Sequence, residues 1–367
     1  MNTARVLLLW MLVACNPITK TPQEFLTGEL RGFITDTLYL EKDYKTKDLD
    51  GQMVYIEKQG QPYLYTFRDY RLLQYAYTSG KLVATQEYEK EGPDGIGTWI
   101  SGHLIEAEEI FFISNAKELV RADHQGKVVQ RYQLPEPAAE RMGANYSTMN
   151  NNSMFYSLEE NNLLIKDIPL VLKAPNLQYE NWLLKLDLDN GDFEHLSFQY
   201  PQYYSSYLED PELGAYFHTL LWDQNKHLIG FAATDSMLII SNGPSAWVEG
   251  KSSQTLEFLP GKTEINGEWT MFLPNNESSR YKWFINDPYQ QRVVRDVVVG
   301  VGGEANGQPY YKKSLILFDE ELKRIGEVSY TSEEFLSVGF PTPQGLYFPL
   351  AQQESDDEVA YARINFP

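Results

Sequence analysis

The sequence predicts an all-β protein, and within that class a six-bladed β-propeller. Three observations carry this prediction. Helical periodicity is nearly absent after residue 30, and short apolar runs rich in Tyr, Val, Ile, Leu and Phe alternate with clusters of turn-forming residues. Strand–turn–strand units also recur at intervals that average about 60 residues, so the chain holds about six of them. A small antiparallel sheet cannot bury both faces alone, which favours units stacked radially in a ring.

Five of these units are visible as hairpins. In each, an apolar run meets a polar turn and then a second run, and one turn contains Asn190-Gly191, a dipeptide typical of tight hairpins. The five hairpins span residues 72–83, 118–129, 182–191, 236–244 and 314–325.

The two ends of the chain are consistent with a closed ring. The C-terminal region offers apolar runs at residues 345–350 and 359–366, and the sequence stops before an outer strand. Residues 30–40 could supply that strand, so an N-terminal strand would complete the last blade and leave no open sheet edge. A two-sheet sandwich and a seven-bladed ring are the alternatives.

The N-terminus has the pattern of a bacterial lipoprotein signal. Arg5 gives a positive start, Val6–Val13 is an apolar stretch of eight residues, and small Ala14 precedes Cys15. Eight residues are too few to span a bilayer, which takes about 20. We therefore expect residues 1–14 to be a signal peptide and Cys15 to carry the lipid. An ordinary secretory signal is the alternative.

The rest of the chain then divides into two parts. Residues 15–30 are polar with two prolines and are expected to form a lipidated tether, and residues 31–367 are expected to form a single propeller domain. Cys15 is the only cysteine, so the domain has no internal disulfide. The expected location is the outer membrane, on its periplasmic or surface side, and an inner-membrane location is the alternative.

Composition limits the partners. The chain carries 51 acidic and 31 basic residues, a net charge of −20. Such a surface repels phosphates, so we expect no nucleic acid partner. The membrane, through the N-terminal lipid, is the expected attachment, and a glycan, a peptide or an envelope protein is the expected ligand.

No catalytic residue, metal site or cofactor is predicted. The histidines lack zinc-type spacing, although His218 and His227 flank one turn. Asp187–Asp192 resembles a calcium loop but lacks its closing glutamate, which favours an acidic hairpin tip. Gly300–Ala305 resembles a dinucleotide loop, but a breaker run follows it where a helix is needed.

Four tyrosines are the candidate ligand-binding residues: Tyr200, Tyr203, Tyr204 and Tyr207. They surround Pro201 in a long segment between two expected blades. Long loops often carry function, and an aromatic cluster there could stack on sugars or peptides. Packing of these rings against a neighbouring blade is the alternative.

Several motifs resemble a known family. They are Ser79–Leu82 with Glu91–Gly97, Asp287-Pro288-Tyr289 with Arg295, and Leu315–Glu327 with Gly345–Tyr347. The chain resembles the lipoproteins of the domain of unknown function 4221 family, found mainly in the Bacteroidetes. Val293-Val294 departs from the Tyr-Tyr that members often show before the arginine. The resemblance implies a six-bladed propeller and assigns no activity.

These observations favour a membrane-anchored binding or scaffolding propeller of the cell envelope. The absence of catalytic motifs, the acidic charge and the aromatic loop support this function. A carbohydrate-active hydrolase or lyase on a propeller scaffold and a structural subunit of an envelope complex are the alternatives.

Overall fold

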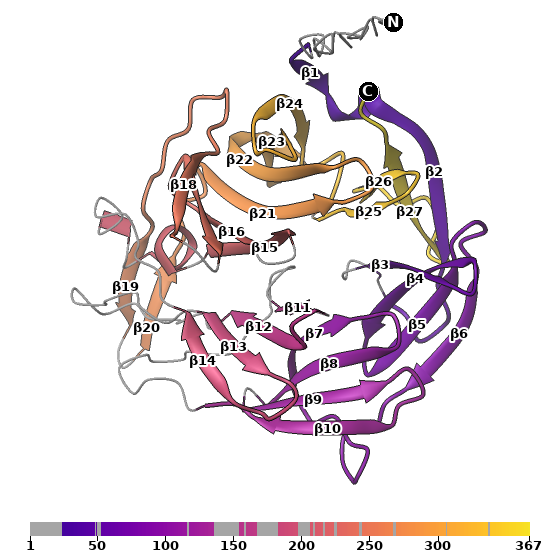
Figure 1. Ribbon diagram of the computed structural model, residues 1–367. Helices are drawn as coiled ribbons and strands as arrows, with labels where there is room; N and C mark the ends of the chain where they lie inside the picture. Colours follow the sequence, from indigo (N-terminus) through magenta and orange to yellow (C-terminus); the bar gives the residue numbers. More distant parts are fainter. Residues whose placement is uncertain are drawn as a thin grey trace, which may run out of the picture.

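The computed structural model forms a ring of small antiparallel sheets around a central axis (Figure 1). It describes residues 24–367 apart from 48, 50–52, 116, 136–153, 158, 167–182, 197–205, 208–209, 216, 224–225, 242–243, 267–268, 306 and 337. Cys15 and the expected signal peptide lie outside the described residues.

Six sheets are the blades, each with four strands ordered from the axis outward, and one of them gains a fifth strand at its outer edge. Blade 1 consists of β3 (Val54–Lys58), β4 (Gln61–Arg68), β5 (Arg71–Ala76) and β6 (Leu82–Glu87). Blade 2 consists of β7 (Ile100–Ile105), β8 (Glu109–Ser114), β9 (Glu118–Asp123) and β10 (Val128–Gln133). Blade 3 consists of β11 (Met154–Ser157), β12 (Asn162–Lys166), β13 (Leu183–Asp187) and β14 (Phe193–Leu196).

The second half of the chain builds the other three. Blade 4 consists of β15 (Phe217–Asp223), β16 (Lys226–Phe231), β17 (Ser236–Ser241) and β18 (Ala246–Glu249). Blade 5 consists of β21 (Arg280–Asp287), β22 (Arg292–Ala305), β23 (Gln308–Asp319) and β24 (Arg324–Thr331). Blade 6 consists of β25 (Phe340–Thr342), β26 (Gly345–Pro349), β27 (Glu358–Ile364) and the N-terminal strand β2 (Ile34–Glu41).

The ring closes as the sequence predicts. Strand β2 pairs antiparallel with β27, from Ile34 opposite Ile364 to Glu41 opposite Glu358. A strand near the N-terminus therefore completes the last blade, and Figure 1 shows indigo β2 beside yellow β27. This arrangement confirms the six-bladed propeller and its N-terminal closing strand.

The five hairpins visible in the sequence are the outer pairs of blades 1 to 5. Each joins the third strand of a blade to the fourth, as β5 joins β6 and β23 joins β24. Blade 6 shows no such hairpin because its third and fourth strands come from opposite ends of the chain. Its missing hairpin is therefore a consequence of the closure.

Apolar side chains fill each junction between neighbouring blades. Among the described residues, six buried clusters occupy the six junctions, and each draws on both adjoining sheets. The junction of blades 6 and 1 joins Leu40 and Tyr361 to Leu64 and Tyr75. Because a continuous core runs around the ring, the closing junction is packed like the others.

Blades 4 and 5 are also joined by a buried arginine. Arg295, part of one family-like motif, has no exposed surface and lies 3.6 Å from the ring centre of Tyr281. Its guanidinium donates to the carbonyl oxygens of Gly250 at 2.9 Å and Phe231 at 3.1 Å. Arg295 therefore has a structural role.

Five elements add to the simple ring. Strand β1 (Leu26–Glu29) pairs in parallel with the outer edge of β24, so the end of the expected tether belongs to the fold. A short 3-10 turn, η1 (Leu30–Phe33), leads from β1 to β2. The hairpin of β19 (Lys262–Asn266) and β20 (Trp269–Leu273) follows blade 4 along the chain and comes before blade 5, and η3 (Pro211–Ala215) precedes blade 4. Within the described residues, no helix has the length and apolar character needed to cross a membrane.

Candidate functional site

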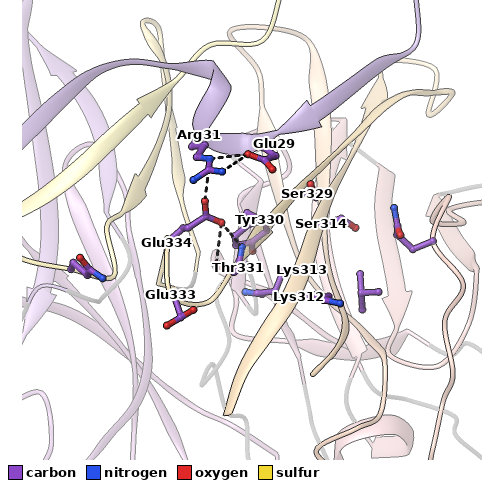
Figure 2. A pocket seen from close by; sticks show the side chains of 13 residues that line it. Glu29, Arg31, Lys312, Lys313, Ser314, Ser329, Tyr330, Thr331, Glu333 and Glu334 are labelled. Carbon is purple, nitrogen blue, oxygen red and sulfur yellow. Dashed lines mark hydrogen bonds and ion pairs between the residues drawn. The ribbon is translucent and has the colours of Figure 1, made fainter. Parts of the chain in front are cut away.

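Blade 5 carries a cavity of about 660 Å³ beside its two outer strands (Figure 2). Strands β22 and β23 are the longest in the described chain, with 14 and 12 residues, and extend past their neighbours. The N-terminal segment, fixed along β24, forms another wall. The lining residues are Glu29, Arg31, Gln254, Val299, Lys312, Lys313, Ser314, Ser329, Tyr330, Thr331, Glu333, Glu334 and Gln352. We call this cavity the blade 5 pocket.

Ion pairs order one side of the pocket. Arg31 donates from Nε to Glu29 Oε2 at 2.8 Å and lies 3.7 Å from Glu334 Oε1 (Figure 2). Glu334 Oε2 accepts from the backbone nitrogen of Thr331 at 2.8 Å and from its hydroxyl at 3.0 Å. The contact between Arg31 and Glu334 links the N-terminal segment to the residues just after β24. Both ion pairs of Arg31 are worth little because its side chain is largely exposed.

A buried carboxylate lies behind the pocket. Asp296 has no exposed surface, and one of its oxygens accepts a hydrogen bond from the Tyr330 hydroxyl. Its other oxygen makes no hydrogen bond and lies 3.4 Å from Lys313 Nζ. Burial, and then the charge of Asp296, raise the pKa of the Tyr330 phenol well above its usual value. The phenol is therefore a fixed donor, and the Lys313 ammonium offsets the buried charge.

The sheet register explains why these groups meet. Lys313 lies directly opposite Tyr330 across β23 and β24, and opposite Val298 across β22 and β23. Asp296 is two residues before Val298, so it points to the same face of the sheet. The Lys313 ammonium also lies 4.9 Å from the centre of the Tyr330 ring. The geometry is thus set by backbone pairing before any ligand arrives.

Two charged groups of the pocket make no ion pair with the described residues. Lys312 and Glu333 are both exposed, and neither has an ion pair within the part of the chain that the structure describes. They are of opposite sign and open onto the same cavity (Figure 2). The pocket therefore offers a free cation and a free anion above a preorganised, buried ion pair.

The innermost strand of blade 5 adds cations near the axis. Arg280 Nε lies 3.4 Å from Glu212 Oε2 of η3, and its guanidinium lies 5.8 Å from the Tyr311 ring centre. Burial, followed by the charge of Arg280, lowers the pKa of Lys282. Arg280 is thus paired with a carboxylate, and the charged form of the neighbouring Lys282 is disfavoured.

Two of the described histidines are largely buried and uncharged. Burial lowers the pKa of His103 and of His227 to about 4, so both are neutral near pH 7. His218 lies opposite Gly230 and His227 opposite Leu221, so the two are not cross-strand partners. Within the described residues, no group of three or more His, Cys, Asp or Glu could hold a metal ion.

The calcium-like and dinucleotide-like runs have structural roles. In the first, Asp187 Oδ1 accepts from the backbone nitrogen of Asp189 at 2.8 Å, and Asn190 Oδ1 from that of Asp192 at 2.7 Å. These bonds form a turn between β13 and β14, as the hairpin interpretation predicts. The run Gly300–Ala305 lies in β22 and pairs antiparallel with β23, so no helix follows it.

The four candidate tyrosines divide between described and undescribed parts. Tyr200, Tyr203 and Tyr204 lie outside the described residues. Tyr207 is half-buried, packs against the core between blades 3 and 4, and lies 6.4 Å from Phe258 between ring centres. A ligand role for the four stays a prediction.

Sequence reasoning missed the blade 5 pocket. Its lining comes from residues 29–31, 312–314 and 329–334, which form no local motif. The one available signal was the pair of strand-like runs on either side of Asn306–Pro309, within residues 292–319, which could have marked an extended hairpin.

Comparisons with known proteins agree with this fold. The model of the domain of unknown function DUF4221 matches residues 29–329. The chain belongs to the DUF4221 family. The crystal structure of a DUF4221 member from Bacteroides vulgatus ATCC 8482 is similar, with a TM-score of 0.71 at 16% identity, covering 90% of this chain and 97% of that one.

A second solved structure is more distant. It is that of a protein from Bacteroides fragilis NCTC 9343 whose name describes it as exported. The TM-score is 0.54 at 10% identity, and the match covers 93% of this chain and 99% of that one. No curated protein matches the chain. At these identities the likenesses concern the fold, and the DUF4221 family has no assigned function.

Proposed function

We propose that this DUF4221 protein is a lipid-anchored binding propeller of the cell envelope. The signal pattern ending at Cys15 supports the anchor, and the export named for the Bacteroides fragilis structure supports a location outside the cytoplasm. The rigid ring holds its partner at a fixed place beside the membrane. The outer membrane is the proposed location.

The blade 5 pocket is the proposed binding site, and its occupant is a charged segment of a polypeptide. The observation that carries this is the free pair Lys312 and Glu333 above the buried pair of Lys313 and Asp296. A polypeptide offers both signs of charge at side-chain spacing, which a neutral glycan does not. A preorganised wall also lowers the entropy lost on binding.

Site-specific crosslinking tests this function. A photoreactive residue at position 352, which lines the pocket but carries neither proposed charge, should capture a discrete envelope protein, whereas the same residue at exposed position 81 on blade 1 should not. Combining the probe at 352 with Glu333→Lys should reduce the captured product by at least about fivefold, the effect of losing a charge pair of ~1 kcal/mol. Equal capture at both positions, or capture unchanged by Glu333→Lys, would refute the proposal.

One observation favours a hydrolase as the second candidate. Burial, and then the charge of Glu109, raise the pKa of Glu106 to about 7, which is the range of a general acid. Glu109 is committed to Arg121, with Nε 2.5 Å from Oε2. Release of reducing ends from envelope polysaccharides that is lost in Glu106→Gln would support this candidate.

A further inference from the structure

A second cavity, of about 470 Å³, lies between blades 1 and 2, away from the blade 5 pocket. Its walls are the face of blade 1 that looks toward blade 2, the β3–β4 turn and the β9–β10 turn. We call it the glutamine groove because five of its lining residues are glutamines: Gln59, Gln61, Gln74, Gln86 and Gln125.

The register of blade 1 places these groups on one face. Gln61 lies opposite Lys58, and Gln74 lies opposite both Tyr65 and Ala84. Directly opposed residues of an antiparallel sheet point to the same side, so this set forms one continuous surface. Tyr63 lies between Gln61 and Tyr65 in the alternating order of β4 and shares that face.

Most of the carboxamides have no partner. Among the described residues, the side chains of Gln59, Gln61, Gln74 and Gln125 make no hydrogen bond. The exception is Gln86, whose Nε2 donates to the carbonyl of Glu87 at 2.7 Å. Each free carboxamide offers both a donor and an acceptor, which matches a ligand of hydroxyl groups that also donate and accept.

Lys58 and His124, which line the groove, already have partners within the protein. His124 Nε2 donates to the carbonyl of Glu106 at 3.0 Å, which leaves Nδ1 as the acceptor for the Lys58 ammonium, also at 3.0 Å. Lys58 Nζ lies 3.8 Å from Glu108 as well. No carboxylate lines the groove, and its one ammonium is balanced. The surface therefore favours a neutral ligand.

An aromatic ring supplies the remaining feature. Tyr63 is half-buried in the groove wall, and the buried Tyr65 supports it at 6.3 Å between ring centres. A half-exposed ring held on a strand gives a flat apolar platform at low entropic cost. The C–H face of a pyranose can pack on such a platform while its hydroxyls reach the carboxamides.

We propose that the glutamine groove binds a short segment of a neutral oligosaccharide. The site combines four free carboxamides, a tyrosine platform and no net charge, within the volume range of ligand pockets. It is independent of the polypeptide site on blade 5, so either can fail without the other. A propeller with both would hold a protein partner and a glycan at once.

Titration calorimetry on the purified mature chain tests the proposal, with neutral gluco-, galacto-, manno- and xylo-trisaccharides as probes and a tri-galacturonide as the charged comparison. At least one neutral probe should bind. Gln61→Ala and Gln74→Ala should each weaken it about 2–12-fold, the range for one hydrogen bond of 0.5–1.5 kcal/mol.

Control variants separate binding from folding. Gln130→Ala, at an exposed position of β10 outside the groove, should leave the affinity unchanged. Thermal melting should show that Gln61→Ala, at an exposed position, keeps the fold. Three results would each overturn the proposal. They are no binding by any neutral probe, an affinity in Gln61→Ala and Gln74→Ala equal to that of the wild type, and tighter binding of the galacturonide than of the neutral probes.

Discussion

Removal of the Leu40 side chain should open the closing junction of the ring. Leu40 has no exposed surface and packs in the cluster between blades 6 and 1, beside Leu49 and Tyr361. Truncation of a fully buried leucine to alanine costs about 2–5 kcal/mol, because it removes apolar burial and leaves a cavity. We expect Leu40→Ala to destabilise the whole propeller by ~3 kcal/mol.

The adjacent residue provides a matched control. Tyr39 precedes Leu40 on β2 but points to the other face and is 46% exposed. Tyr39→Ala removes a larger side chain from the same strand, yet it should cost about 1 kcal/mol or less. The comparison separates burial at the junction from strand propensity.

Urea unfolding followed by tryptophan fluorescence, with calorimetry, measures both variants. An unfolding entropy of about 2.1 cal/mol/K per residue gives ~0.7 kcal/mol/K for ~340 residues, so ~3 kcal/mol lowers Tm by ~4 °C. A loss in Leu40→Ala no greater than that in Tyr39→Ala would refute the reasoning that β2 closes the ring through a packed core.

Three further predictions concern a buried acid, a turn and the anchor. Burial raises the pKa of Glu106 from 4.5 to about 7, so the wild-type protein loses unfolding free energy as pH rises through that window. The unfolding free energy of Glu106→Gln relative to the wild type should therefore be higher at pH 8 than at pH 5, by ~3 kcal/mol at most. The exposed Glu108→Gln should show no such difference. A Cβ at Gly80 (φ +67°) would lie 1.7 Å from a carbonyl oxygen of β2, so Gly80→Ala should lower the unfolding free energy by more than Gly60→Ala (φ +75°), where nothing lies within 4 Å. Cys15→Ala should abolish metabolic labelling with palmitate and leave an unprocessed precursor; persistent labelling would contradict the lipoprotein prediction.

The sequence by itself determined the fold class and the closure. The alternation of apolar and polar residues and the residue types of turns are local properties. The outer hairpins of blades 1 to 5 could therefore be predicted from the sequence, including the one with the Asn190-Gly191 turn. The unpaired C-terminal strand required a partner, and β2 was the apolar segment available to supply it. The DUF4221 resemblance pointed to the same architecture.

Only the tertiary structure decided where the candidate sites lie. The blade 5 pocket brings Glu29 and Lys312 together across nearly the whole chain, and the glutamine groove joins Gln61 to Gln125 across two blades. Periodicity shows which face of a strand is buried, but it carries no information on which blades meet or how far each strand extends. Those contacts form only when the blades and the N-terminal segment pack together, because each site is built from segments that are separate in sequence.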